Sequence, residues 1–166
     1  MTISFEEALR GGKTEVTLPD GQKVRLTIPK GAEEGQKVRL KGRGGEGPGG
    51  QRGDLYITFH VRPSPRFRRD GLDLTLTETI NVAEALLGTT RTITTAYGDT
   101  IKVTIPPGTQ PGERLRLRDQ GIKTDDGAGA LFVEVAVTIP TSVEDKAGLR
   151  AWAEKEGLLG AAKSAA

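Results

Sequence analysis

The strongest constraint on the fold of this chain is an internal repeat. Residues 3–41 return without a gap at residues 80–118, so that Ile-Ser-Phe-Glu-Glu-Ala-Leu-Arg-Gly, which begins at Ile3, is answered by Ile-Asn-Val-Ala-Glu-Ala-Leu-Leu-Gly. After one deletion the match resumes, and residues 53–57 correspond to residues 129–133. A repeat of this length indicates a duplicated small domain rather than a solenoid unit. The chain should therefore contain two similar modules in tandem.

Apolar and polar residues alternate through both repeats. Val24, Leu26 and Ile28 place apolar side chains on one face. Arg25 and Thr27 take the other face. A period of two with one polar face is typical of half-buried antiparallel strands. We therefore predict an all-β fold of two tandem, homologous, β-sandwich-like modules.

Helical patterns are scarce. A short helix over residues 5–10, with a twin in the second repeat, and one longer helix over residues 143–156 are expected to accompany the strands. The proline-containing segment 62–70 is interpreted as a semi-rigid linker that few contacts cross. The predicted parts are a first β module, a second β module, and a C-terminal helix with its tail: 1–64, 65–140 and 141–166.

The sequence offers no candidate for catalysis or metal binding. Cysteine is absent and His60 is the only histidine, which removes thiol chemistry and cysteine-based zinc sites. The glycine-rich loop of residues 42–50 contains the spacing G-x-G-x-x-G, but Pro48 and another strand follow it, whereas a nucleotide site requires a helix there. We predict no catalytic residue, no metal, no cofactor and no enzymatic activity.

Charge and hydropathy limit the partners. Lys and Arg number 24 against 22 Asp and Glu, so the formal net charge of +2 gives weak whole-chain attraction to nucleic acid. No stretch is apolar enough to span a membrane and no signal peptide is visible, so we expect a cytoplasmic protein without a membrane partner. Basic residues cluster nevertheless, which leaves a DNA-binding surface as an alternative. The clusters are Lys37, Arg39, Lys41 and Arg43; Arg66, Arg68 and Arg69; and Arg114, Arg116 and Arg118.

Several motifs together resemble the C-terminal substrate-binding fragment of the DnaJ family of J-domain co-chaperones. They are the segment that begins at Ile3, Ile-Pro-Lys-Gly at 28–31, Gly-Asp-Leu-Tyr-Ile at 53–57, and Pro-Ser-Pro-Arg-Phe-Arg-Arg-Asp-Gly-Leu-Asp-Leu at 63–74. The family's His-Pro-Asp motif and its cysteine-rich zinc insert are missing. The chain therefore resembles the zinc-less type, which includes the curved-DNA-binding relatives. It begins close to the first family strand, so we expect the start of the groove-forming segment to be missing.

The resemblance implies a chaperone role in the stress response. It implies that the chain binds unfolded polypeptides, which a J domain outside this fragment helps to deliver to the seventy-kilodalton heat-shock chaperone. The family's client groove would fall on Val16 and Leu18, with Ile3 nearby and Phe67 closing the pocket from the linker. Because that linker has no core of its own, we expect Phe67→Ser to weaken client capture while leaving thermal stability nearly intact.

The helix predicted over residues 143–156 suggests self-association. Leu149 and Trp152 are three residues apart, so they share one face of it. The first module does without an equivalent helix, and an aromatic residue at such a place is typical of an interface anchor. With the resemblance, this predicts a homodimer held by the C-terminal helix. A DNA-binding domain and a purely structural dimerisation scaffold stay open as alternatives to the client-binding module.

Overall fold

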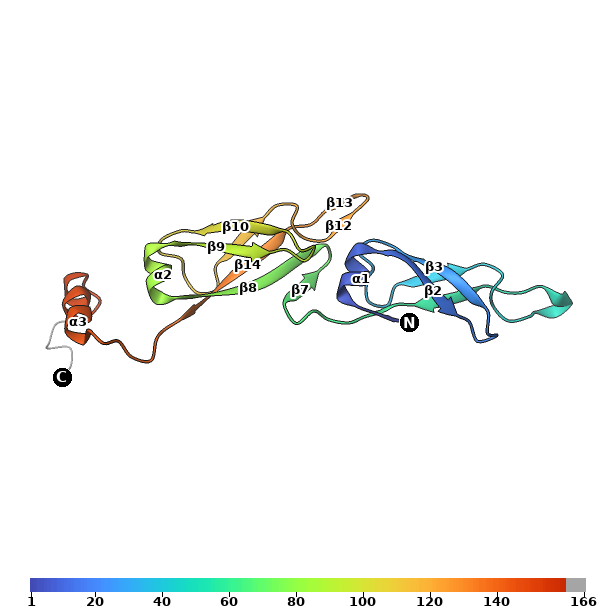
Figure 1. Ribbon diagram of the computed structural model, residues 1–166, viewed down its shortest axis with the longest axis horizontal. Helices are drawn as coiled ribbons and strands as arrows, with labels where there is room; N and C mark the ends of the chain where they lie inside the picture. Colours follow the sequence, from blue (N-terminus) through green and yellow to red (C-terminus); the bar gives the residue numbers. More distant parts are fainter. Residues whose placement is uncertain (161–166) are drawn as a thin grey trace.

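Each repeat folds into its own set of small β-sheets, and this confirms the all-β class. The computed structural model describes residues 1–160. Figure 1 shows the first module, the second module and a separate C-terminal helix following one another along the long axis of the molecule. Strands pair only with strands of their own repeat.

The first module consists of three strand pairs and one helix. β1 (Thr2–Ile3) runs parallel to β6 (His60–Val61). The antiparallel pairs are β2 (Gly12–Thr17) with β3 (Lys23–Ile28), and β4 (Lys37–Leu40) with β5 (Leu55–Thr58). The helical elements are α1 (Phe5–Arg10) and the short 3-10 turn η1 (Pro48–Gly50) in the glycine-rich loop. The apolar strand faces meet in a core made of Ile3, Ala8, Leu26, Ile28, Ala32, Ile57 and Phe59.

The second module is built around one sheet of four strands. Its centre is a long parallel pair, β8 (Asp73–Asn81) and β14 (Leu131–Thr138), in which Leu74 lies opposite Leu131. β7 (Phe67–Asp70) and β11 (Arg114–Leu117) flank this pair. The other elements are α2 (Val82–Leu87) and two hairpins, β9 (Thr89–Thr94) with β10 (Thr100–Ile105), and β12 (Lys123–Thr124) with β13 (Gly127–Ala128).

The two short helices begin in the same way. The Ser4 hydroxyl accepts a hydrogen bond from the backbone N–H of Glu7 at 3.1 Å, and the Glu7 carboxylate accepts one from the N–H of Ser4 at 2.7 Å. Asn81 and Glu84 repeat both bonds at α2. This reciprocal cap satisfies N–H groups that a helix start leaves unpaired, so both short helices lie where the repeat predicts them.

The segment expected to be a linker is a strand in its second half. Phe67–Asp70 pairs with β8, where Phe67 lies opposite Leu76. Only 7% of Phe67 is exposed. It shares a core cluster with two apolar residues of α1, Phe5 and Leu9, and with residues of the second module: Leu74, Leu76, Ile93, Val103, Ile122, Leu131 and Val133. The expectation of few contacts across the linker is therefore not met, because β7 brings apolar surface against the first module.

The C-terminal helix is shorter than predicted. α3 (Lys146–Lys155) begins after Asp145, whose carboxylate accepts a hydrogen bond from the backbone N–H of Gly148 at 2.8 Å. Asp145 therefore caps the helix, which begins three residues later than the predicted start at residue 143. Extended backbone separates α3 from β14, and α3 lies beyond α2 at one end of the molecule (Figure 1). Residues 161–166 of the predicted tail lie outside the described residues.

Candidate functional site

A hollow of about 370 Å³ lies between the end of β2 and β5. Val16 and Leu18 line one side, and Tyr56 and Ile57 line the other. Leu18 and Ile57 are almost fully buried, whereas 59% of Tyr56 is exposed. The remaining lining residues are Met1, Thr17, Pro19, Leu55, Thr58 and His60. The hollow is therefore mainly apolar, with an aromatic side chain exposed at its rim.

The residues predicted for the client groove lie in two different places. Val16 and Leu18 are together in this hollow. Ile3 is only 1% exposed and belongs to the first core. Phe67 does not line the hollow but faces the junction of the two modules. The expectation that Phe67 closes the same pocket is not met, because its pairing with β8 holds it in the sheet of the second module.

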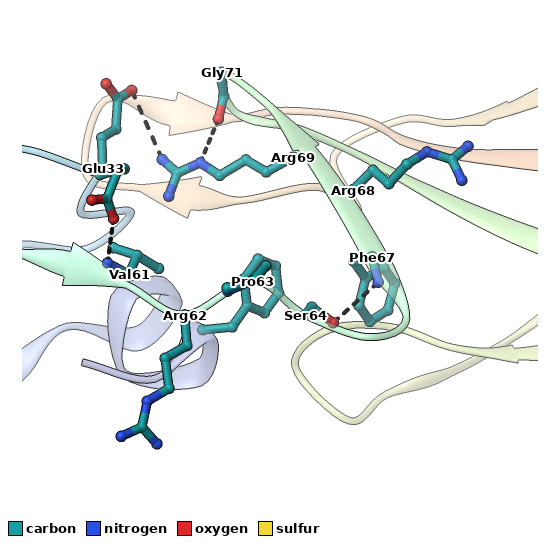
Figure 2. A pocket seen from close by; sticks show the side chains of 11 residues that line it. Glu33, Val61, Arg62, Pro63, Ser64, Phe67, Arg68, Arg69 and Gly71 are labelled. Carbon is teal, nitrogen blue, oxygen red and sulfur yellow. Dashed lines mark hydrogen bonds and ion pairs between the residues drawn. The ribbon is translucent and has the colours of Figure 1, made fainter. Parts of the chain in front are cut away.

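A second hollow, of about 560 Å³, lies at the junction of the modules. Figure 2 shows its lining, with Phe67 on β7 and the guanidinium of Arg69 directed toward Glu33. Arg69 donates hydrogen bonds of 2.6 Å to the carbonyls of Gly31 and Ala32. Burial lowers the pKa of Arg69. The side chain of Arg69 on β7 therefore binds the backbone of the first module.

Glu34 holds the last strand of the first module at the same junction. Its carboxylate accepts a hydrogen bond from the backbone N–H of Val61 at 2.5 Å, and it lies 2.9 Å from Nδ1 of His60. The hydrogen bond with His60, followed by the bond from Val61, lowers the pKa of Glu34. His60 thus has a local structural partner, and no second histidine exists to build a site with it.

Some members of the basic clusters are engaged by other side chains of the molecule. Arg39 pairs with Asp54, and Arg68 lies 2.7 Å from a carboxylate oxygen of Glu134. The guanidinium of Arg114 lies over the ring of Phe132, 4.3 Å from its centroid. The two ion pairs reduce the positive charge that the strand faces can offer to a phosphate backbone, whereas Arg114 keeps its charge.

A third hollow, of about 830 Å³, lies between α2 and α3. Val82, Leu86 and Leu87 line it from α2, and Leu149 and Trp152 line it from α3. Both residues named for self-association are exposed, Leu149 by 48% and Trp152 by 40%. The structure thus places the two predicted interface residues beside an apolar face of α2 that the sequence had not singled out.

The repeat shows why the face of α2 is unusual. Phe5 and Leu9 of α1 correspond to Val82 and Leu86 of α2. The second module covers Phe5 and Leu9, whose exposed fractions are 7% and 1%. Val82 and Leu86 have exposed fractions of 37% and 48%. Neither pair belongs to the core of its own module. The recurrence of apolar residues at these repeat positions is therefore the sequence signal that could have predicted an apolar face on α2.

Within residues 1–160 no group of His, Asp and Glu side chains is placed to hold a metal ion. None of the helices described over that range is long and apolar enough to cross a membrane. The three hollows described above are lined mainly by apolar and ion-paired side chains.

Comparison with known proteins agrees with this geometry. The sequence model of the DnaJ C terminal domain matches residues 1–140. The chain is 42% identical over 158 residues to a protein named Chaperone protein DnaJ from Staphylococcus saprophyticus, an alignment that covers 92% of this chain and 42% of the relative. It is 38% identical over 143 residues to Chaperone protein DnaJ 2 of Corynebacterium glutamicum, covering 84% of this chain and 36% of that protein. The chain thus spans about two fifths of the length of these relatives, and it belongs to the DnaJ C-terminal domain family.

Proposed function

We propose that this chain is the client-binding part of a chaperone and that it holds unfolded polypeptide in the hollow lined by Val16 and Leu18. The observation that carries the proposal is the apolar hollow beside a strand edge, in a chain of the DnaJ C-terminal domain family. An extended segment can add to a sheet edge through its backbone while a pocket takes its side chains. Binding of this kind tolerates many sequences, as unfolded clients require.

The longer relatives carry the word chaperone in their names, and the proposal extends this role to our chain. Delivery of the bound client to the seventy-kilodalton heat-shock chaperone would then depend on a J domain, which these 166 residues do not supply through any His-Pro-Asp motif. The chain itself would contribute capture and release of the client.

The test is a titration with a permanently unfolded, chemically modified protein, followed by NMR shifts. We expect Val16→Thr combined with Tyr56→Ala to weaken binding about tenfold, equivalent to about 1.4 kcal/mol, because both side chains line the hollow. Val24→Thr is the matched control, since Val24 lies opposite Val16 on β3 and does not line the hollow. Equal affinity of all three proteins would contradict the proposal.

We also infer that two copies associate through α3 and the exposed face of α2. The support is the contrast between the covered pair on α1 and the exposed pair on α2. Burying apolar side chains contributes about 25 cal/mol per Å² of area removed from water. A second copy that buries the apolar face of α2 would therefore be held there by this free energy. A chain that binds no unfolded protein but still dimerises would instead be a structural scaffold.

Nucleic acid is the weaker candidate partner, because the formal net charge is only +2 and Arg39 and Arg68 on the strand faces are in ion pairs. Its signature would be a DNA affinity that falls steeply with salt and is not reduced by unfolded protein.

A further inference from the structure

Two arginines line one hollow at the junction of the modules. This hollow, of about 340 Å³, contains Arg10 from the last turn of α1 and Arg66 from the segment before β7. Arg10 donates a hydrogen bond to the carbonyl of Tyr97 at 3.2 Å, and Arg66 donates one to the carbonyl of Thr94 at 2.6 Å. Within residues 1–160 neither side chain forms an ion pair with a carboxylate. The hollow therefore holds two positive charges that no ion pair neutralises.

Both carbonyls lie at one end of the β9–β10 hairpin, so the two guanidinium groups are held at the same turn. Arg66 is held in addition by the ring of Phe67, whose centroid lies 4.7 Å from the guanidinium carbon. A guanidinium carries five N–H donors, and each of these two side chains engages one of its nitrogens with the turn. The other N–H groups are left for a ligand.

Local structure explains only part of this arrangement. A basic residue in the last turn of a helix, such as Arg10, is stabilised by the helix dipole. Its counterpart in the repeat is nevertheless Leu87, so the shared fold of the modules does not require a cation there. Arg66 lies outside any helix and has no dipole to complete. The meeting of the two arginines is therefore better explained by an anion that binds between them.

The rest of the lining limits what this anion can be. The Ser64 hydroxyl accepts hydrogen bonds from the backbone N–H groups of Arg66 and Phe67 at 3.1 and 3.0 Å, so its own proton is left to donate to a ligand. Among the described residues that line the hollow, Glu6 is the only acidic one. Apolar surface comes from Phe5, Pro65 and Ala96. A volume of about 340 Å³ is close to the lower limit of about 300 Å³ for ligand pockets, so the ligand is a small molecule rather than a polymer.

We propose that this hollow binds a small phosphate ester, with the phosphate group between Arg10 and Arg66. Arginine binds phosphate oxygens through two parallel, charge-assisted hydrogen bonds. The hydroxyl of Ser64 donates a further one, and the apolar part of the lining contacts the organic group of the ester. Because Arg10 belongs to α1 and Arg66 precedes β7, the bound phosphate connects the two modules. The inference goes beyond client binding and uses no residue of the hollow of Val16 and Leu18.

Phenyl phosphate is the probe for the full chain, and isothermal titration calorimetry measures its affinity. Arg10→Gln and Arg66→Gln should each weaken binding about tenfold, because each removes hydrogen bonds from a charged donor. Arg62→Gln is the matched control, since it removes the same charge from the same segment, but Arg62 lines the larger junction hollow and not this one. We expect it to change the affinity by less than about twofold. An equal loss in all three variants, or no loss in any of them, would overturn the proposal.

Glu6→Gln guards against a loss of binding that a damaged fold would cause. Glu6 is exposed, and it lines the same hollow as the two arginines. Removing its repelling charge should strengthen the binding of phenyl phosphate about threefold. A variant with a damaged fold cannot bind more tightly, so a gain in affinity supports the assignment. Unchanged affinity in Glu6→Gln would place the phosphate elsewhere and would refute the site.

Two further ligands identify the source of the phosphate. Inorganic phosphate should bind about threefold more weakly than phenyl phosphate, because it buries none of the apolar lining. Equal affinity of the two would assign the hollow to free phosphate and would rule out the ester. A short DNA duplex should not displace phenyl phosphate, because the hollow is too small for a polymer. Displacement by DNA that Arg10→Gln abolishes would assign the site to nucleic acid instead.

Discussion

The ring of Phe5 lies almost parallel to the ring of Phe67, with planes 10° apart and centroids 6.3 Å apart, although the two residues belong to different modules. The guanidinium of Arg66 lies over the Phe67 ring at 4.7 Å from its centroid. Both phenylalanines are 7% exposed. The module junction is therefore a packed apolar contact, and the chain's behaviour under mutation should reflect this.

Phe67→Ala should lower the free energy of unfolding by about 3–5 kcal/mol, the usual cost of deleting a buried phenylalanine ring. Urea unfolding followed by circular dichroism measures it. Tyr56→Ala is the control, since its ring is largely exposed and the loss there should stay below about 1 kcal/mol. Equal, small losses in both variants would restore the view of Phe67 as a linker residue available to clients.

Arg69→Lys should loosen the junction. A lysine ammonium cannot reproduce the planar fork that serves the carbonyls of Gly31 and Ala32 together. We expect a loss of about 1.5–3 kcal/mol in stability, the range for hydrogen bonds to a charged group. NMR relaxation should also show more independent tumbling of the two modules.

Arg68→Lys is the matched control for that experiment, because Arg68 sits next to Arg69 on β7 but is exposed, and its guanidinium bonds to Thr77 and Glu134 of the second module. If both variants keep one common tumbling time, Arg69 does not hold the modules together.

Acid should weaken the hydrogen bonds that the Glu34 carboxylate makes with His60 and with the N–H of Val61 on β6. Its pKa lies below the ordinary value of 4.5, first through His60 and then through the N–H of Val61. A depressed carboxyl pKa gives stability that is fully present above the pKa of the unfolded chain and is lost as the pH falls through the folded value. NMR titration should show the pKa of Glu34 returning toward 4.5 in His60→Ala.

The carboxyl of Asp54 provides the internal control for that titration. The N–H of Gly42 and then Arg39 lower its pKa, and neither cause involves His60. A shift of both carboxyls in His60→Ala would mean a general rearrangement rather than loss of one hydrogen bond.

If two copies associate as proposed, Leu149→Asp should shift the chain from dimer to monomer in sedimentation velocity, because it places a charge in the hollow between α3 and α2. Ala151→Asp adds the same charge to an exposed position of α3 that does not line this hollow. It should leave the dimer intact. A wild-type chain that sediments as a monomer at high concentration would exclude the interface altogether.

The sequence predicted those features that depend on local pattern. Alternation predicted the strands, and the local pattern predicted the short helix over residues 5–10, whose capping box in the structure lies within four consecutive residues. Val16 and Leu18 were placed in a common hollow by the family resemblance, and the structure brings them together.

The burial of Phe67 could not be predicted in the same way. It depends on β7 pairing with β8 and on α1 of the other module meeting that sheet, and both are tertiary contacts without a local signal. The prolines at 63 and 65 indicated extended backbone, which is equally compatible with a linker and with the approach to a strand. Phe5 and Leu9 do not pack in the first core, and no local pattern shows that they pack against the second module.

The apolar face of α1 is buried and that of α2 is exposed. This difference limits the symmetry that an assembly of copies can have. Within one chain the face of α1 meets a different surface on the next module, which is a heterologous contact. If a further copy covered α2 in that manner, each addition would expose another α2 face and the assembly would grow into a filament. Pairing the α2 ends about a two-fold axis closes the assembly at two copies. The first modules would then lie at the far ends, since the first module and α3 lie at opposite ends of one chain (Figure 1), so the particle would be bivalent by symmetry, with one hollow of Val16 and Leu18 in each copy.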